Sequence, residues 1–309
     1  MTNFNLLQQS KNFINDYSNT EIFTYHDGLV GIDRTLPKQR KIRLPQIDKI
    51  INASFMASDG VTIATRIYLP VTTKQKLPLI IYYHGGGWVI GDLDYMDGGC
   101  QYLAMHSEAI VISIDYRLAP EHPYPIPQND AYEGFLWAVE NHLQLPIDST
   151  KVGVAGDSAG GNLAAAVAVR ALEENGPKIH KQLLIYPALD ATKIYPSYEE
   201  FGHGLGLDAD EMHQYYEHYV QKNEQLQHPY ISPKLFTQKE LLPETIIVAA
   251  EYDVLNDEGI EYINELEQAG VVAEHFILPG LIHSFFSKMN YFEQQTNDAT
   301  ALLADFFRR

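Results

Sequence analysis

The chain has 309 residues, of which 45% are hydrophobic and 20% are charged, so it can bury a sizeable core. Its formal net charge of −18 argues against a nucleic-acid partner, because a phosphate backbone is bound by a basic surface. The same charge disfavours binding to anionic lipid and is compatible with a neutral small-molecule substrate.

A single cysteine, Cys100, rules out an intramolecular disulfide. The first residues show no basic segment followed by an apolar run. No stretch approaches the ~20 apolar residues that a membrane-spanning helix needs. We therefore expect a cytoplasmic protein without stable membrane association.

Residues 1–50 carry a loose helical pattern, which is interrupted around residues 18–20. A basic, proline-punctuated connector follows at residues 37–45. The apolar positions that fit one side of one or two short helices are Phe4, Leu6, Leu7, Phe13 and Ile14.

From residue 51 onward the pattern is regular. A Ser-Asp-Gly turn between residues 51–56 and 61–69 predicts a β-hairpin. Short apolar runs typical of buried strands follow at residues 79–83, 110–114, 152–155, 183–186, 246–249 and 273–278. Helical patterns occupy residues 130–142, 159–174, 208–222 and 258–269, with a C-terminal helix near 297–307. This alternation predicts an α/β fold with a mostly parallel, doubly wound sheet and an antiparallel N-terminal hairpin.

The first chemical motif lies at residues 156–160, which read Gly-Asp-Ser-Ala-Gly and stand between a strand and a small-residue helix. This is the context that a Gly-x-Ser-x-Gly nucleophile elbow requires. Ser158 would take a strained backbone angle there, so glycines two positions away avoid a collision. For this motif alone, an ordinary glycine-rich turn is the alternative.

The second motif is the His-Gly-Gly-Gly stretch at residues 84–87, directly after an apolar strand. Consecutive glycines leave backbone N–H groups uncovered, which suits an oxyanion hole. A phosphate-binding loop is the rival interpretation, but neither a following Gly-Lys-Ser/Thr nor a Gly-x-Gly-x-x-Gly spacing is present.

A serine nucleophile needs a general base and a group that orients the base. Asp253 and His283 each follow a late strand, so both should emerge at the carboxyl edge of the sheet with Ser158. Glu251 and Asp257 compete with Asp253. We expect Asp257 to cap the helix that begins at residue 258, and Glu251 to lie too close to the strand end.

The remaining histidines are expected to be structural. His213 and His218 are five positions apart, so they do not share a helix face as a metal-binding pair would, and no metal site is expected. We expect His84 to hold its own glycine loop by hydrogen bonds.

Together these motifs resemble the hormone-sensitive-lipase-like carboxylesterases (bacterial esterase family IV) of the α/β-hydrolase superfamily. The resemblance covers roughly residues 50–309. It rests on residues 84–87, 115–125, 156–162 and 186–187 and on the Asp253 and His283 loops. It implies catalytic residues Ser158, Asp253 and His283, and an oxyanion hole formed by the backbone N–H groups of Gly86, Gly87 and Ala159.

The resemblance also implies a division of the chain. Residues 51–309 would form the catalytic domain, and residues 1–50 with a further segment near 192–227 would form a helical cap over the substrate. Residues 115–125 would brace the active-site loops. The chain departs from the family pattern at Val254, where the family has proline, and at Ser284, where it has glycine.

The resulting hypothesis is a serine carboxylesterase that hydrolyses small to medium acyl esters through an acyl-enzyme, with no metal or organic cofactor. An amidase, deacetylase or acyltransferase on the same fold would share every residue named. A small-molecule receptor is the rival from another class, but the receptors of this fold have lost the triad histidine. The expected partner is a small-molecule ester, and a homodimer stays open.

Overall fold

The computed structural model describes residues 4–17, 22–26, 29–34, 44–140 and 144–309. The strands are β1 (Phe23–His26), β2 (Leu29–Ile32), β3 (Ile47–Met56), β4 (Thr62–Pro70), β5 (Leu77–Tyr83), β6 (Ile110–Ile114), β7 (Ile147–Asp157), β8 (Lys181–Ile185), β9 (Glu244–Tyr252) and β10 (Ala273–Ile282). The α-helices are α1 (Gln8–Tyr17), α2 (Asp97–Ser107), α3 (Ile126–Glu140), α4 (Ala159–Glu173), α5 (Pro196–Phe201), α6 (Ala209–Tyr219), α7 (Asn256–Gln268) and α8 (Met289–Arg308).

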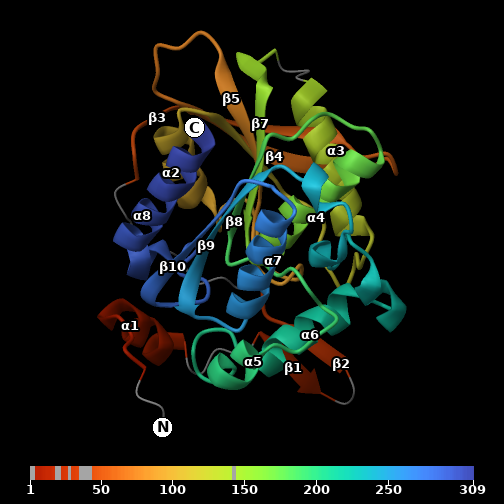
Figure 1. The fold of residues 1–309 in the computed structure, drawn as a ribbon, viewed down its shortest axis with the longest axis vertical. Helices are drawn as coiled ribbons and strands as arrows, with labels where there is room; N and C mark the ends of the chain where they lie inside the picture. The colour runs from red at the N-terminus through yellow and green to blue at the C-terminus, as the bar shows by residue number, and fades with distance from the viewer. Residues whose placement is uncertain (1–3, 18–21, 27–28, 35–43, 141–143) are drawn as a thin grey trace.

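One eight-stranded sheet, in the order β10-β9-β8-β7-β5-β6-β4-β3, organises the molecule (Figure 1). From β10 across to β6 all neighbouring strands are parallel. β3 and β4 form an antiparallel hairpin, which joins β6 antiparallel at the edge. This confirms the predicted mostly parallel sheet with an antiparallel N-terminal hairpin.

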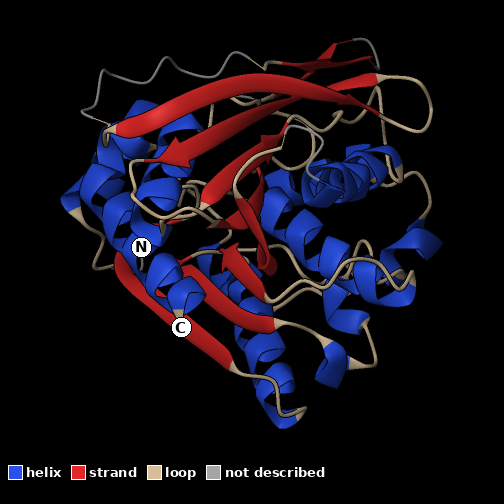
Figure 2. Ribbon diagram, turned by 90° about the horizontal axis from the view of Figure 1, so that it is seen from above, coloured by secondary structure: helices blue, strands red, loops and turns tan. Residues whose placement is uncertain are grey.

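Helices cover both faces of the sheet, and Figure 2 shows the two helical layers from above. Successive side chains of a strand point to opposite faces, so a strand that is apolar throughout needs cover on both sides. In β5, Leu79 and Ile81 pack into the core shared with α3, α4 and α7. Ile80 and Tyr82 pack into the core shared with α2 and α8.

The N-terminal region differs in part from the prediction. The helix α1 confirms one of the helices expected in residues 1–50. Of the one or two short helices expected there, the described residues contain one, and the residues after the expected break form the antiparallel pair β1 and β2. Aromatic and β-branched residues in Phe23–His26 favour a strand, but four residues are too few for a clear pattern. Residues 18–20 and most of the connector at 37–45 lie outside the described residues.

The helices expected from the sequence do not include α2 or α5. The C-terminal helix is expected near residues 297–307, but α8 begins at Met289. The helix α2 contains Gly98 and Gly99 and is buried on most sides, so it shows no amphipathic period. The helix α5 has only six residues. In α8 the non-helical backbone of Phe292 separates the first turn from the rest, which hid the start at Met289.

Segments far apart in the sequence meet at one end of the molecule, where α1, the β1–β2 pair, α5 and α6 lie together at the bottom of Figure 1. The ring of Phe23 in β1 lies 5.2 Å from the ring of Tyr215 in α6. Phe4, before α1, packs edge-on against Phe201 of α5 at 6.0 Å. Within the described part of the chain, no helix has the length and apolar character needed to cross a bilayer.

Candidate active site

Ser158 occupies the sharp turn between β7 and α4, with φ 56° and ψ −120°. A positive φ is uncommon and strained for a residue with a side chain. A Cβ on Gly156 would collide with the carbonyl of Gly160, and a Cβ on Gly160 would collide with the carbonyl of Tyr83. The turn therefore requires glycine at both flanking positions, as the elbow motif predicts.

His283 lies between the serine and an acid. Its Nε2 is 3.0 Å from Oγ of Ser158, and its Nδ1 is 2.6 Å from Oδ2 of Asp253. All three residues are buried: His283 is 4% exposed, Ser158 is 8% exposed and Asp253 is 2% exposed. When Nδ1 donates its hydrogen to the carboxylate, Nε2 is left as an acceptor for the serine hydroxyl. This is the arrangement in which an imidazole can act as a general base.

The other oxygen of Asp253 is held by its own loop, because Oδ1 accepts the backbone N–H of Leu255 at 2.9 Å. Its competitor Glu251 lies inside β9, and Oε2 of Glu251 accepts the N–H of Gly280 at 2.7 Å. Asp253, not Glu251, is therefore the acid that the structure brings to His283.

Asp257 is also engaged elsewhere, where its Oδ2 accepts the N–H of Ser197 in α5 at 2.8 Å. The predicted capping role of Asp257 is wrong. The helix α7 begins at Asn256 and has no side-chain N-cap, so Asp257 lies within its first turn and reaches across to α5.

The glycine loop after β5 adopts backbone conformations that favour glycine. Gly86 has φ 117° and Gly87 has φ 58°. A Cβ on Gly86 would collide with the carbonyl of Ile90, and a Cβ on Gly87 with the ring of Tyr215. Both glycines line the same pocket as Ser158. Ala159 is the first residue of α4, where a backbone N–H has no intrahelical acceptor.

His84 has the structural place that the sequence predicts. It is fully buried, and its Nδ1 lies 2.8 Å from the carbonyl of Gly85. The ring of Tyr116 stacks on it at 4.3 Å, and the Tyr116 hydroxyl donates to the His84 carbonyl at 2.7 Å. Burial lowers the pKa of His84 to about 4, so the ring is neutral at physiological pH.

Asp157 is a buried acid whose place the sequence reasoning missed. Its Oδ1 accepts the hydroxyl of Tyr82 at 2.7 Å and the N–H of Gly85 at 2.8 Å. These bonds join the glycine loop to the residue before Ser158. Burial raises the pKa of Asp157 to about 6. The one available signal was its place beside the serine in the elbow.

A cavity of about 270 Å³ opens at Ser158. Residues from two distant segments line it: Phe13, Ile14, Tyr17 and Ile22 from the N-terminal part, and Gly204, Gly206, Leu207, Asp208, Glu211, Met212 and Tyr215 from the part around α6. Ser284 and Lys288 line the side next to His283. Burial raises the pKa of Glu211, which favours the un-ionised carboxyl in this cavity.

His213 and His218 do not line this cavity. His213 is exposed and lies 3.4 Å from Glu217 on the same helix, and His218 stacks on Phe23. In the described ranges, no group of three or more His, Cys, Asp or Glu side chains is arranged to hold a metal ion.

A family model described as the alpha/beta hydrolase fold matches residues 80–287. Carboxylesterase NlhH of Mycobacterium tuberculosis is 37% identical over 270 residues, which cover 85% of this chain and 84% of the relative. An ethyl acetate hydrolase of Pseudomonas putida is 34% identical over 80% of this chain and 79% of its own length.

The chain is also similar to solved structures of ester hydrolases. An ester hydrolase from the metagenome of Lake Arreo superposes with a TM-score of 0.87 at 31% identity, covering 98% of this chain and 100% of the other. An esterase of Pyrobaculum calidifontis superposes with a TM-score of 0.80 at 36% identity, covering 85% of each chain. The chain therefore belongs to the α/β-hydrolase family and, within it, to the hormone-sensitive-lipase-like carboxylesterases that its sequence motifs resemble.

Proposed function

We propose that the chain hydrolyses small to medium carboxylic esters through an acyl-enzyme formed on Ser158. The observation that carries this proposal is the continuous hydrogen-bonded line from Asp253 through His283 to Ser158. In this line Ser158 is the nucleophile, His283 moves the proton and Asp253 orients the imidazole.

In the first half of the reaction, Oγ of Ser158 attacks the ester carbonyl carbon while Nε2 of His283 takes the hydroxyl proton. The negative charge that develops on the carbonyl oxygen is stabilised by the backbone N–H groups of Gly86, Gly87 and Ala159. His283 then gives its proton to the departing alkoxide, so the alcohol leaves neutral and the acyl group stays on the serine.

In the second half, a water molecule replaces the alcohol. His283 takes a proton from the water as its oxygen attacks the acyl carbon, and the same N–H groups receive the charge again. The carboxylic acid leaves when the proton returns to Oγ of Ser158. A transferase or amidase would use the same groups, but no observation in this structure favours either.

The size of the substrate follows from the cavity. At about 270 Å³ it is slightly smaller than most small-molecule sites, which span roughly 300–1,000 Å³. The ethyl acetate hydrolase among the relatives acts on a small ester, which supports a short acyl group here. We assign the covering of the cavity to a cap made by residues 1–50 and the segment near 192–227. Residues lining the cavity from both segments support this assignment.

The environment and assembly of the protein are also proposals. Its one cysteine, Cys100, is buried and free, which suits a reducing cytoplasm. Size-exclusion chromatography with light scattering would decide between a monomer and a homodimer.

The direct test is a series of p-nitrophenyl esters from acetate to palmitate. We expect kcat/KM to be highest between acetate and hexanoate, because the cavity admits only short chains. We also expect no jump in rate when the substrate forms micelles. A preference for palmitate with such a jump would contradict the covered pocket, and no turnover of any ester would contradict the function itself.

A further inference from the structure

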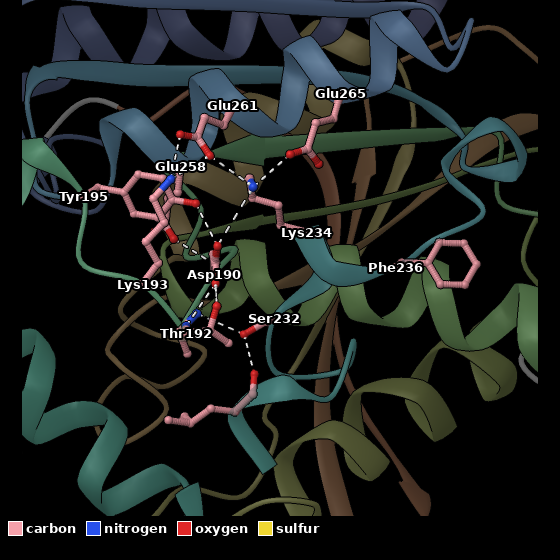
Figure 3. A network of polar contacts seen from close by, with 12 residues as sticks. Asp190, Thr192, Lys193, Tyr195, Ser232, Lys234, Phe236, Glu258, Glu261 and Glu265 are labelled. Carbon is pink, nitrogen blue, oxygen red and sulfur yellow. Dashed lines mark hydrogen bonds and ion pairs between the residues drawn. The ribbon is translucent and has the colours of Figure 1, made fainter. Parts of the chain in front are cut away.

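Glu258, in the first turn of α7, is completely buried. Its Oε2 accepts the backbone N–H of Asp190 at 2.8 Å, and Figure 3 shows the network of which this contact is a part. Within the described residues, its Oε1 has no hydrogen-bond partner. A charged carboxylate is costly in such a place, since it has lost its water and one of its oxygens has no hydrogen-bond partner among the described residues. Burial accordingly raises the pKa of Glu258 well above its ordinary value.

Other carboxyl groups near Glu258 favour the same neutral state. Asp190 is almost fully buried, and its Oδ2 accepts the hydroxyl of Tyr195 at 2.7 Å. The ammonium of Lys234 lies 4.0 Å from Asp190 but is shared with Glu261 at 3.1 Å on the outer side of the network (Figure 3). The ionisable groups that interact with Glu258 are Asp190, Asp253, Tyr195, Tyr198 and Tyr216. Because Asp190 and Asp253 both repel a further negative charge, the Glu258 carboxyl is accommodated in its protonated form.

The first turn of α7 is continuous with the loop that carries Asp253. The N–H of Asn256, where the helix begins, donates to the carbonyl of Asp253 at 3.1 Å. On the same loop, the Ser197 hydroxyl donates to the carbonyl of Val254 at 2.6 Å. The start of α7 and the loop that carries Asp253 are therefore joined by chain and by hydrogen bond.

The segment after β8 touches both the serine turn and α7. The N–H of Ala188 lies 3.3 Å from the carbonyl of Ser158, and two residues later the N–H of Asp190 meets Glu258. A path of only a few bonds thus joins the backbone of Ser158 to the helix that follows Asp253. The contact between Asp190 and Glu258 closes this path.

We propose that Glu258 is a positioning residue, which sets the place of Asp253 relative to Ser158 by tying α7 to the segment after β8. This inference rests on the roles proposed above for those two residues. The part of Glu258 that matters is an acceptor oxygen for the N–H of Asp190, so a neutral amide can replace the carboxyl.

Two substitutions separate the acceptor from the charge. Glu258→Gln keeps an acceptor oxygen and removes the ionisable group. Glu258→Met removes both at a similar side-chain volume, so it leaves no cavity, but it also leaves the buried N–H of Asp190 without its acceptor. The control is Glu261→Gln, one turn later on α7, in the same network but 41% exposed and without a contact to Asp190.

We expect Glu258→Met to be folded, with kcat for p-nitrophenyl acetate lowered about tenfold and KM changed less than about twofold. Glu258→Gln and Glu261→Gln should keep kcat within about twofold of the unmodified protein. An unchanged kcat in Glu258→Met would overturn the inference, even if its melting temperature changed. A Glu258→Gln variant as slow as Glu258→Met would overturn it as well.

A double substitution shows whether Glu258 acts through Asp253. The variant with both Asp253→Asn and Glu258→Met should be no slower than Asp253→Asn alone, because the group that is positioned is already disabled. A loss equal to the product of the two single losses would assign Glu258 an independent role and reject the inference. If Asp253→Asn alone kept full activity, the proposed triad itself would fail, which is a separate result.

Discussion

The hydroxyl of Tyr82 at the end of β5 donates to Oδ1 of Asp157 at the end of β7, at a distance of 2.7 Å. The same oxygen accepts the N–H of Gly85, so a single carboxyl oxygen joins the glycine loop to the turn that carries Ser158. This places a buried, titrating acid next to Ser158 in the chain, and it has a consequence for stability.

Burial raises the pKa of Asp157 from about 3.8 to about 6. The folded protein therefore holds this proton up to a higher pH than the unfolded chain does. As pH rises from about 4 to about 6, this group lowers the free energy of unfolding by up to ~3 kcal/mol, and its contribution is constant at higher pH. Asp157→Asn does not titrate and keeps an oxygen for both donors.

We therefore expect Asp157→Asn to gain in melting temperature relative to the unmodified protein as pH rises through this range, by a few degrees in total. Thermal melts at closely spaced pH values would measure this difference. Tyr82→Phe is the control, because the Tyr82 hydroxyl lowers the pKa of Asp157 and its loss should move the transition to higher pH. A difference that is the same at every pH would contradict a raised pKa for Asp157.

The second prediction concerns the nucleophile. Ser158→Ala should lower kcat by a factor on the order of 10³–10⁶ with the fold unchanged, because alanine removes only the hydroxyl from the strained turn. Circular dichroism should be the same for both proteins. A fluorophosphonate should label the unmodified protein once, at Ser158, as mass spectrometry of the peptides would show. Labelling of another serine would displace Ser158 from this role.

The third prediction separates three neighbouring acids. Asp253→Asn should lower kcat about 10³–10⁴-fold, because an amide at this place favours the wrong imidazole tautomer. Asp257→Asn and Glu251→Gln should cost stability instead, because a neutral amide oxygen accepts the N–H groups of Ser197 and Gly280 more weakly than a carboxylate does. Steady-state kinetics below the melting temperature would separate the two effects. Equal losses of kcat at Asp253 and Asp257 would leave Asp253 without a distinct role.

The parts of the site that the sequence predicts are those with a local signature. The glycine loop and the serine elbow each follow a buried strand within a few residues. Asp253 and His283 follow β9 and β10, which are adjacent parallel strands, so strand order alone brings their loops together.

The parts that the sequence does not predict depend on contacts between distant segments. The partners of Asp157 lie 72 and 75 positions away along the chain and that of Glu258 lies 68 away, and no spacing rule links such pairs. The cavity walls from the N-terminal part and from α6 meet only after both segments have packed. Amphipathic periodicity finds neither these contacts nor a helix such as α2, which is buried on most sides.

The last prediction concerns Ser284, which stands where the related family pattern has glycine. Its φ of 67° lies in the left-handed region, and its carbonyl accepts the N–H groups of Ser287 and Lys288 at 3.1 Å each. Ser284→Gly should relieve about 1–2 kcal/mol of backbone strain, offset by about 0.5–1 kcal/mol for the freer unfolded chain. We expect a net gain in stability of up to about 1.5 kcal/mol, measurable by denaturant unfolding.

The same substitution should change selectivity, because Ser284 lines the cavity next to His283, the residue that protonates the leaving alcohol in the proposed mechanism. Removing its hydroxymethyl group should raise kcat/KM for esters of bulky alcohols and leave methyl and ethyl esters of the same acid nearly unchanged. Kinetics with one acyl group and a graded series of alcohols would measure this. A uniform change across the series would instead mean that Ser284 acts by positioning His283. Equal kcat/KM values for both proteins throughout would show that the hydroxymethyl group does not limit the alcohol side, whatever its effect on stability.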